Sequence, residues 1–301
     1  FPARWMPDGA YGYGLPYFTY YASFSTHVAA WFKLAGFSYA LAIKLAQAAA
    51  IALGAWAVYG WIGSFGSAPS GRVQARPLAA AIAYTFAPFH LVNVYARGDS
   101  LAELWALALA PLAFWAAERL GQRRSFGRAA ALAATIALIV CTHNVSALMF
   151  LPFIGVYALA RTADGGPQTA DDQPSSFVVR HSSFVHRLTS VVHRVSPAVA
   201  ALAWGVALSA FFWLPALAET GAVQLSSLTN GYFSYTGHFR SADLLQSDWI
   251  FSYSQNPFAM GLTQTFVALA GLIAFLSRRE KLNWRDGFVL GEGGAAIVLE
   301  R

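Results

Sequence analysis

Charged residues are scarce in this chain of 301 residues. Asp, Glu, Lys and Arg make up only 11% of it, against about 25% in typical soluble domains. Hydrophobic residues make up 57%, and the mean hydropathy is +0.46. A soluble core of this length could not bury so much apolar surface. The composition therefore excludes a disordered, collagen-like or cytosolic globular protein and predicts an all-α, polytopic integral membrane helical bundle.

Cysteine is nearly absent as well. The single Cys141 excludes an internal disulfide bond and a zinc site built on cysteines. The chain also lacks a phosphate-binding loop, because Gly12-Tyr-Gly14 is no dinucleotide fingerprint and no glycine-rich stretch ends in Gly-Lys-Ser or Gly-Lys-Thr. A soluble nucleotide-sugar site is therefore not indicated. The net charge of +6 is typical of basic cytoplasmic loops in membrane proteins, so we predict no nucleic-acid partner.

Long apolar runs predict about seven membrane spans. A spanning helix needs roughly 20 mostly apolar residues. The candidate runs are 37–62, 77–94, 101–120, 129–142, 145–160, 198–217 and 262–277. The fourth and fifth are short and could instead form one re-entrant hairpin. The start of the chain is rich in Gly, Pro and Tyr, as loops are, so we expect at least one further span upstream of it.

Basic residues alternate between the predicted loops and orient the bundle. Fourteen lie on one side: Arg72, Arg76, Arg119, Arg123, Arg124, Arg128, Arg161, Arg180, Arg187, Arg194, Arg278, Arg279, Lys281 and Arg285. The other side holds four: Arg4, Lys33, Arg97 and Arg240. Because Lys and Arg are enriched in cytoplasmic loops, the first set predicts the cytoplasmic side.

This orientation divides the chain into five segments. We expect a first external loop at 1–36, a transmembrane bundle at 37–160 and a cytoplasmic loop with an amphipathic helix at 161–197. Transmembrane helices follow at 198–277, with a long external loop at 218–261. A cytoplasmic tail occupies 278–301.

Unusual polar residues collect on the predicted external side, and ionisable groups at membrane depth are costly and usually functional. Asp8, between Pro7 and Gly9, either closes a turn or acts as a general base that its apolar and aromatic neighbours desolvate. Tyr11 and Tyr13 could stack on a sugar ring or belong to an interfacial aromatic belt. Both interpretations stay open at this point.

Three further positions on that side carry candidate chemistry. Arg97 could hold a phosphate through its planar fork or anchor to a lipid headgroup. Glu103 could bind substrate or only stabilise the first turn of its helix. His143 and Asn144 could act on substrate or satisfy backbone groups at a helix break. Asp99, Glu103 or the first-loop aspartate could ligate a divalent metal, but no spacing demands one, so we predict no certain cofactor.

Several stretches, taken in order, resemble a known family. They are residues 4–16, 86–98, 101–103, 142–148, 209–217 and 230–233. Over about residues 1–277 the chain is similar to bacterial multi-pass membrane proteins catalogued as 6-pyruvoyl-tetrahydropterin synthase-related, and looks like the GT-C class of integral-membrane glycosyltransferases. Residues 286–300 resemble a short β-ketoacyl synthase segment, to which we assign no function.

The resemblance implies an enzyme of the bacterial cytoplasmic membrane whose active face is external. Such enzymes take a sugar from a polyprenyl-phosphate carrier and typically use an acidic residue in the first external loop, where Asp8 matches. Substrate contacts would come from Arg4, Tyr11, Tyr13, Arg97, Glu103, His143 and Asn144. The acceptor would be a glycan, a lipid or a protein. Two alternatives remain open from the residues: a lipid or polysaccharide transporter or flippase, and a non-catalytic membrane scaffold.

Overall fold

The computed structural model describes residues 4–65, 74–91, 94, 100–164, 184–222, 230, 245, 249 and 261–277. These residues form mainly helices, and an isolated β-bridge joins Met6 and Leu15. The α-helices are α1 (Tyr17–Tyr20), α2 (Phe24–Leu34), α3 (Tyr39–Gly63), α4 (Ala75–Thr85), α5 (Pro88–Leu91), α6 (Leu101–Gln122), α7 (Phe126–Val140), α8 (Asn144–Ala163), α9 (Phe184–Leu208), α10 (Ala210–Ala218) and α13 (Leu262–Ser277). Short 3₁₀ turns lie at Ala10–Gly12 and Thr220–Ala222. The all-α prediction is confirmed for this part of the chain.

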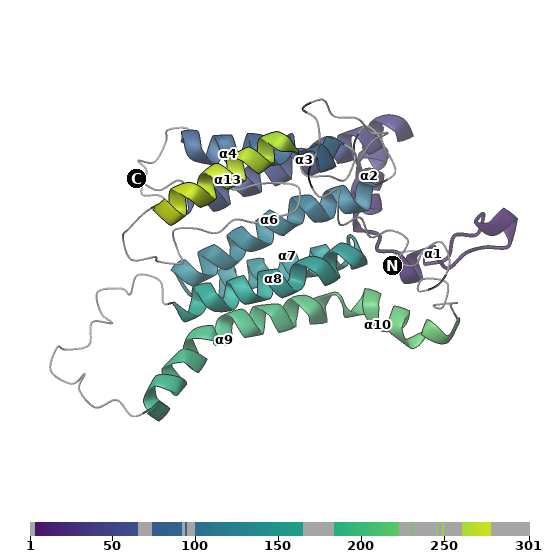
Figure 1. Cartoon of the computed structure of the whole chain (residues 1–301). Helices are drawn as coiled ribbons and strands as arrows, with labels where there is room; N and C mark the ends of the chain where they lie inside the picture. The colour runs from purple at the N-terminus through teal and green to yellow at the C-terminus, as the bar shows by residue number, and fades with distance from the viewer. Residues whose placement is uncertain are drawn as a thin grey trace.

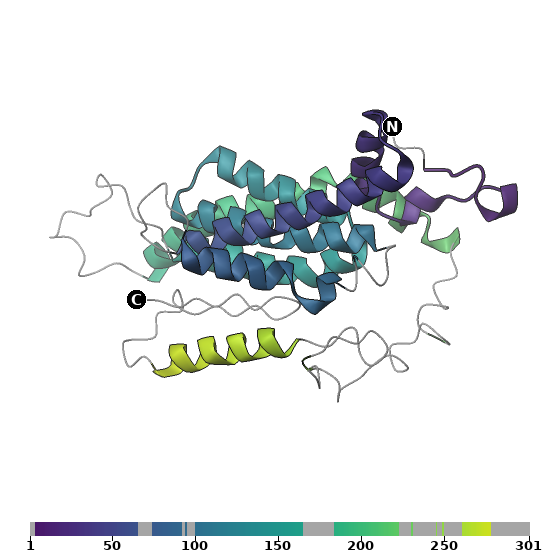
Figure 2. The ribbon, with the colours of Figure 1, turned by 90° about the horizontal axis from the view of Figure 1, so that it is seen from above.

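Helix α6 lies at the centre of the bundle. It packs against α3, α7 and α8. Of its apolar stretch of 18 residues, 72% is buried inside the structure, compared with 33% for the corresponding stretches of α3 and α8. Small side chains allow helix backbones to approach closely in a membrane, and α6 buries Ala106, Ala113 and Ala117 completely. Figures 1 and 2 show α6 enclosed by its neighbours, whereas α13 lies at one side of the bundle.

Three helices, α3, α6 and α8, are long and apolar enough to cross a membrane. The segment Val192–Leu208 of α9 and helix α10 qualify as a span only together, and they are bent by 62° at the break between them. Helix α7 is apolar but has only 15 residues. The described residues therefore hold three or four helices suited to a membrane, and the count of about seven spans stays a prediction.

The segment predicted as a first external loop contains a helix, which the sequence did not predict. Helix α2 has 11 residues and packs against α3 and α6. It buries Ser25 and Val28, while Phe24 meets the Trp105 ring edge-on at 5.5 Å. Helix α2 is thus stabilised mainly by tertiary packing, which the apolar runs of the sequence did not reveal.

Helix α9 corrects a second boundary. We expected a surface helix that ends before a separate span beginning at residue 198, but α9 continues through Pro197 to Leu208. Proline is tolerated in apolar helices because neighbouring groups can satisfy the backbone carbonyl that it leaves free. The break falls instead at Ser209, whose hydroxyl donates to the carbonyl of Val206 at 2.8 Å.

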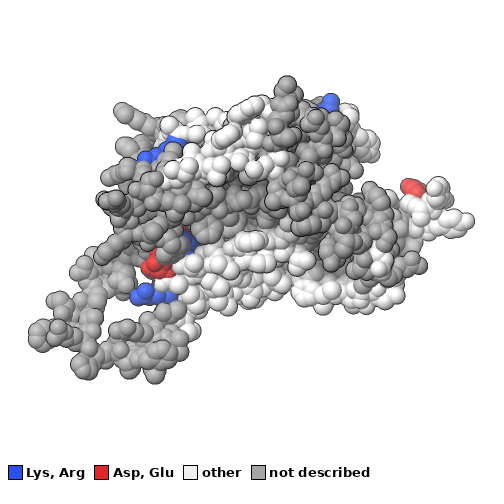
Figure 3. All heavy atoms as spheres, viewed as in Figure 1, with Lys and Arg blue, Asp and Glu red and all other residues white. Residues whose placement is uncertain are grey.

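The two ends of the bundle differ in charge. One end holds the start of α4, the α6–α7 connection and the end of α8, with the basic residues Arg76, Arg119, Arg123, Arg124, Arg128 and Arg161. The other end carries α1, α2, α10 and the α7–α8 turn (Figure 1), with Arg4 and Lys33. Along the middle, the described atoms in Figure 3 are almost free of charged side chains. Basic loops that we assigned to one side of the membrane thus share one end of the bundle.

Two glycines provide a matched test of helix packing. A Cβ at Gly205 would lie 2.7 Å from Cβ of Ile136 and 2.8 Å from the carbonyl oxygen of Ala133, so α9 contacts α7 closely there. We expect Gly205→Ala to lower the free energy of unfolding by about 1–3 kcal/mol, because the buried contact cannot take another methyl group. Thermal unfolding in nanodiscs measures the effect.

The control for this prediction is Gly127→Ala in the first turn of α7. A Cβ at Gly127 would meet nothing within 4 Å. The substitution should leave stability unchanged or raise it by up to about 1 kcal/mol, since alanine restricts the unfolded chain. Equal midpoints for the two variants would contradict the close packing of α7 and α9.

Candidate functional site

The predicted base, Asp8, lies in a projecting loop at the N-terminal end. Met6 and Leu15 pair across this loop through two backbone hydrogen bonds of 2.8 and 2.9 Å, and the loop extends away from the helices in Figure 1. Asp8 is exposed. We expected neighbouring side chains to desolvate its carboxylate, but the described side chains leave it exposed. A bound substrate or lipid would therefore have to desolvate it. Exposure does leave the carboxylate accessible to an acceptor hydroxyl.

The tip of the same loop has an unusual backbone. Ala10 and Tyr11 adopt φ values of 51° and 59°, which non-glycine residues rarely do. At Gly14, with φ 84°, a Cβ would collide with the Trp5 ring, so only glycine fits there. Strained backbone of this kind is often kept at functional sites, where surrounding contacts hold it in place.

The strained backbone presents two aromatic side chains outward. Tyr11 is 103% exposed and Tyr13 is 88% exposed. Apolar faces this open can contact a sugar ring, a lipid surface or another protein segment. The structure thus keeps both interpretations of the tyrosines open, and it adds that their rings are accessible.

Hydrogen bonds tie the N-terminal segment to the end of the bundle. The Arg4 guanidinium donates to the carbonyl of Phe211 in α10, and the Tyr20 hydroxyl donates to the carbonyl of Glu219 at 3.0 Å. The Asn144 amide donates to the carbonyl of Tyr20 at 3.3 Å. Arg4 and Asn144, both predicted to bind substrate, therefore also position the loop that carries the candidate base.

His143 caps the N-terminus of α8. Its Nδ1 accepts a hydrogen bond from the backbone N–H of Ser146 at 3.3 Å and lies 2.7 Å from the Ser146 hydroxyl, which donates to it. The α7–α8 turn is also joined to α2, since the backbone N–H of Phe24 donates to the carbonyl of Cys141 at 2.9 Å. Helices α7 and α8 are thus two separate helices joined at this turn, and His143 has a structural task whether or not it contacts substrate.

Substitution of His143 separates the two roles. We expect His143→Ala to lower the free energy of unfolding by about 1 kcal/mol, as loss of an N-cap does, while His143→Ser keeps a capping oxygen and most of the stability. Thermal unfolding should be measured for both variants, together with the sugar transfer that the family resemblance leads us to expect. Loss of turnover in a stable His143→Ser protein would place the imidazole in the chemistry, and full turnover would leave it a cap alone.

The remaining predicted site residues are placed only in part. Glu103 lies half-buried in the first turn of α6, at the same end of the bundle as Asp8. Arg97 and Asp99 fall outside the described residues. Within the residues that are described, no group of three His, Cys, Asp or Glu side chains is close enough to hold a metal ion. The structure thus brings Arg4, Asp8, Glu103, His143 and Asn144 to one end of the bundle.

A buried ion pair lies at the opposite end and was not predicted from the sequence. Glu118 of α6 is 1% exposed, and both of its carboxylate oxygens accept hydrogen bonds from the Arg161 guanidinium of α8. The Tyr157 hydroxyl donates to the same carboxylate at 2.8 Å, and the Gln122 amide donates to it at 3.1 Å. A buried carboxylate is tolerable when its charge is paired and its oxygens are bonded in this way.

The ion pair joins three helices. Gln122 also donates to the carbonyl of Ser64 at the end of α3, and the Trp61 indole of α3 donates to the Tyr157 hydroxyl at 3.1 Å. Trp61 stacks on Phe114 with ring centroids 5.0 Å apart. Glu118 inside a largely apolar helix was the available signal, but the sequence predicts Arg161 only as a loop residue. Together these contacts fix α3, α6 and α8 to one another.

Comparisons with known proteins add no further constraint. No protein-family model, curated protein or solved structure matches the chain. The function has to be inferred from the residues, their placement at the two ends of the bundle and the physical chemistry of each group.

Proposed function

We propose that this protein is an integral-membrane glycosyltransferase of the GT-C type, which moves a sugar from a polyprenyl-phosphate carrier to an acceptor at the external face of the bacterial cytoplasmic membrane. The observation that supports it most is the gathering of Arg4, Asp8, Glu103, His143 and Asn144 at one end of a helical bundle whose other end is basic. With the basic end in the cytoplasm, the candidate site faces outward. A lipid-borne donor suits that side, because nucleotide sugars stay in the cytoplasm.

The proposed reaction is a single displacement. Asp8 takes the proton of the acceptor hydroxyl, the acceptor oxygen attacks the anomeric carbon, and the bond from that carbon to the phosphate oxygen breaks. Negative charge then collects on the departing polyprenyl phosphate, where Arg97 and Arg4 would stabilise it. One displacement inverts the configuration at the anomeric carbon, as in inverting glycosidases.

The sugar itself would lie against the projecting loop. Tyr11 and Tyr13 expose their rings next to Asp8 in sequence, so a sugar held by them would lie near the proposed base. Glu103, His143 and Asn144 would bind hydroxyl groups from the α6 and α7–α8 side. The exposure of Asp8 makes desolvation by the bound substrate part of the proposal.

The proposal is tested by donor consumption. The purified protein is placed in proteoliposomes with radiolabelled polyprenyl-phosphate hexoses, and loss of the labelled donor is followed with and without an added lipid or glycan acceptor. Protein-dependent loss of at least one donor is expected. No loss with any hexose tested would contradict the transferase.

A second candidate, a lipid or polysaccharide transporter, is favoured by one observation. The α9–α10 pair is bent by 62° at Ser209, and discontinuous helices are typical of transporter binding sites. The sequence shows no internal repeat, which weighs against it. In the same proteoliposomes, a labelled lipid that changes leaflet without being consumed would favour the transporter.

A further inference from the structure

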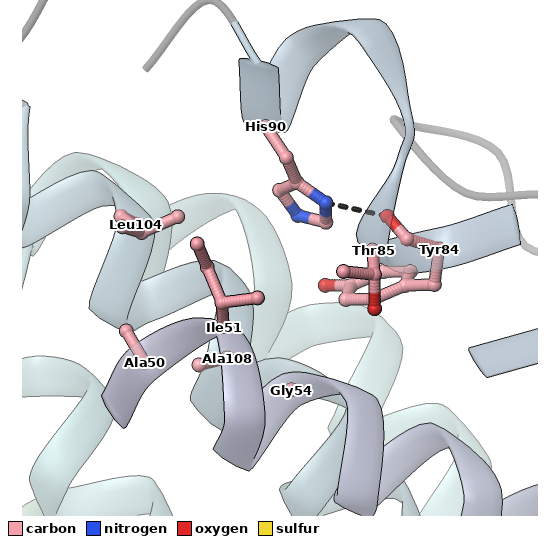
Figure 4. Close-up of a pocket in the computed structure, with 8 residues that line it drawn as sticks. All are labelled: Ala50, Ile51, Gly54, Tyr84, Thr85, His90, Leu104 and Ala108. Atoms are coloured by element: carbon pink, nitrogen blue, oxygen red, sulfur yellow. Dashed lines mark hydrogen bonds between the residues drawn. The ribbon is translucent and has the colours of Figure 1, made fainter. Parts of the chain in front are cut away.

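The small space beside His90, between α3, α6 and the α4–α5 corner, has room for about one water molecule (Figure 4). It is too small for a larger ligand, so a further binding site is to be sought on the surface. A concentration of positive charge lies where α6 ends and α7 begins, at the end of the bundle opposite the candidate site, and the proposed sugar transfer does not use it.

Four arginines lie in the α6–α7 turn and form what we call the α6–α7 arginine cluster: Arg119, Arg123, Arg124 and Arg128. The Arg128 guanidinium donates to the carbonyls of Arg119 at 2.5 Å and of Arg123 at 3.3 Å, so it lies across the end of α6. Arg124 donates to the carbonyl of Thr162 near the end of α8 at 3.2 Å. Two of the four guanidinium groups are thus held at helix C-termini, where carbonyl groups carry partial negative charge.

The cluster has no acidic partner among the described residues. Glu118 and Asp164 are the described acidic residues at this end of the bundle, and both lie against Arg161. Glu118 accepts two hydrogen bonds from its guanidinium, and Asp164 lies 3.8 Å from it. The side chains of Arg119 and Arg123 are exposed and form no ion pair within the part of the chain that the structure describes.

The positive charges of the cluster are close enough to act on one another. The pKa of Arg128 is lowered, first by burial and then by the charges of Arg119 and Arg123. A bound anion relieves repulsion of this kind. A phosphodiester suits several guanidinium groups, because its oxygens accept hydrogen bonds from their planar forks. The cluster therefore indicates an anion that carries a phosphate group.

The position of the cluster favours a lipid over a free anion. Helix α6 has 22 residues and is about 33 Å long, close to the hydrocarbon core of about 30 Å, so its end lies near the depth of lipid phosphates. Phe126, in the same turn, is 91% exposed. The first turns of α7 also expose a face of small residues: Gly127, Ala130, Ala131 and Ala134. An acyl chain can lie along this apolar face while its headgroup meets the arginines.

We propose that the α6–α7 arginine cluster binds an anionic glycerophospholipid, whose phosphodiester accepts hydrogen bonds from Arg119 and Arg123 and whose acyl chain lies along Phe126 and the exposed face of α7. An anionic lipid is preferred to a zwitterionic one, because only a net negative charge offsets the cluster. Basic residues beside a membrane attract such lipids. The site is independent of the proposed sugar transfer, since it uses no residue of the candidate site at the other end.

A lipid titration tests the preference for charge. The purified protein in detergent is titrated with phosphatidylglycerol or with phosphatidylcholine, and bound lipid is measured by native mass spectrometry. Phosphatidylglycerol should bind about tenfold more tightly. Inorganic phosphate in large excess should not displace it, because phosphate has no acyl chain. Equal affinities for the two lipids, or displacement by phosphate, would overturn the proposal.

Variants of exposed arginines test the location. Arg119→Gln and Arg123→Gln should each weaken phosphatidylglycerol binding about fivefold, the usual effect of one arginine beside anionic lipid. The matched control is Arg76→Gln, which removes an exposed arginine from the start of α4 at the same end of the bundle. It should leave the affinity unchanged. An equal loss in Arg76→Gln would show a general attraction of charge and would overturn the site.

Hydrogen–deuterium exchange locates the contact without any variant. In nanodiscs that contain phosphatidylglycerol, peptides covering residues 119–128 should exchange more slowly than in nanodiscs of phosphatidylcholine, while peptides from α2 should exchange equally in both. Unchanged exchange at 119–128 would contradict the site. None of these measurements depends on turnover, so failure of the lipid site and failure of the proposed sugar transfer are distinguishable.

Discussion

Asp8→Asn is expected to reduce sugar transfer by about 10²–10⁴-fold, the usual contribution of a general base. Asparagine keeps the shape of the side chain but cannot take a proton at neutral pH. Because Asp8 is exposed in a projecting loop, the substitution removes no buried contact and should leave the unfolding midpoint unchanged. Donor consumption in proteoliposomes and thermal unfolding measure the two quantities.

A carboxylate at the same end of the bundle provides the control. Glu219 follows α10 and is exposed, and its backbone carbonyl rather than its side chain accepts the bond from Tyr20. Glu219→Gln should therefore leave transfer at the wild-type level. Full transfer in Asp8→Asn would remove the base from the proposed mechanism, and equal losses in both variants would point to a general effect of charge at that end.

Glu118→Ala is expected to lower the free energy of unfolding by about 3–5 kcal/mol, because it leaves the Arg161 charge buried without its partner. Glu118 is 1% exposed, and the Arg161 side chain is 12% exposed, so solvent screens the pair little. Tyr157 and Gln122 would lose an acceptor as well. Unfolding followed by denaturing-detergent titration measures the change.

The double replacement distinguishes the ion pair from the packing around it. Glu118→Leu combined with Arg161→Met removes both charges and keeps apolar volume between α6 and α8. Buried ion pairs replaced in this way are often neutral or even stabilising, so this variant should be much more stable than Glu118→Ala. If the two proved equally unstable, the loss would come from packing and from Tyr157 rather than from an unpaired charge.

Composition determined the class of the fold. With 57% hydrophobic and 11% charged residues, the chain has to bury apolar surface in helices or in lipid. The long apolar runs therefore located α3, α6 and α8 to within a few residues. The described basic residues of the loops that the sequence assigned to one side of the membrane lie at one end of the bundle, since successive helices reverse direction.

Helix boundaries that depend on tertiary packing were predicted less well. Helix α2 is short and only moderately apolar, and it is fixed by packing against α3 and α6. Pro197 marked a boundary in the sequence, yet α9 continues through it and breaks at Ser209. Local patterns record what a segment prefers, whereas these two outcomes depend on the neighbouring helices.

The sequence by itself determined that this is a helical protein suited to a membrane, and that its unusual polar residues are concentrated towards one end. Only the tertiary structure decided which side chains meet. Glu118 and Arg161 are 43 residues apart, and the small space beside His90 is lined by residues from α3, α4, α5 and α6. The physical reason is that composition and hydropathy describe residues that are neighbours in the chain. Contacts between residues far apart in the sequence depend on the rotation and depth of each helix, which packing alone fixes.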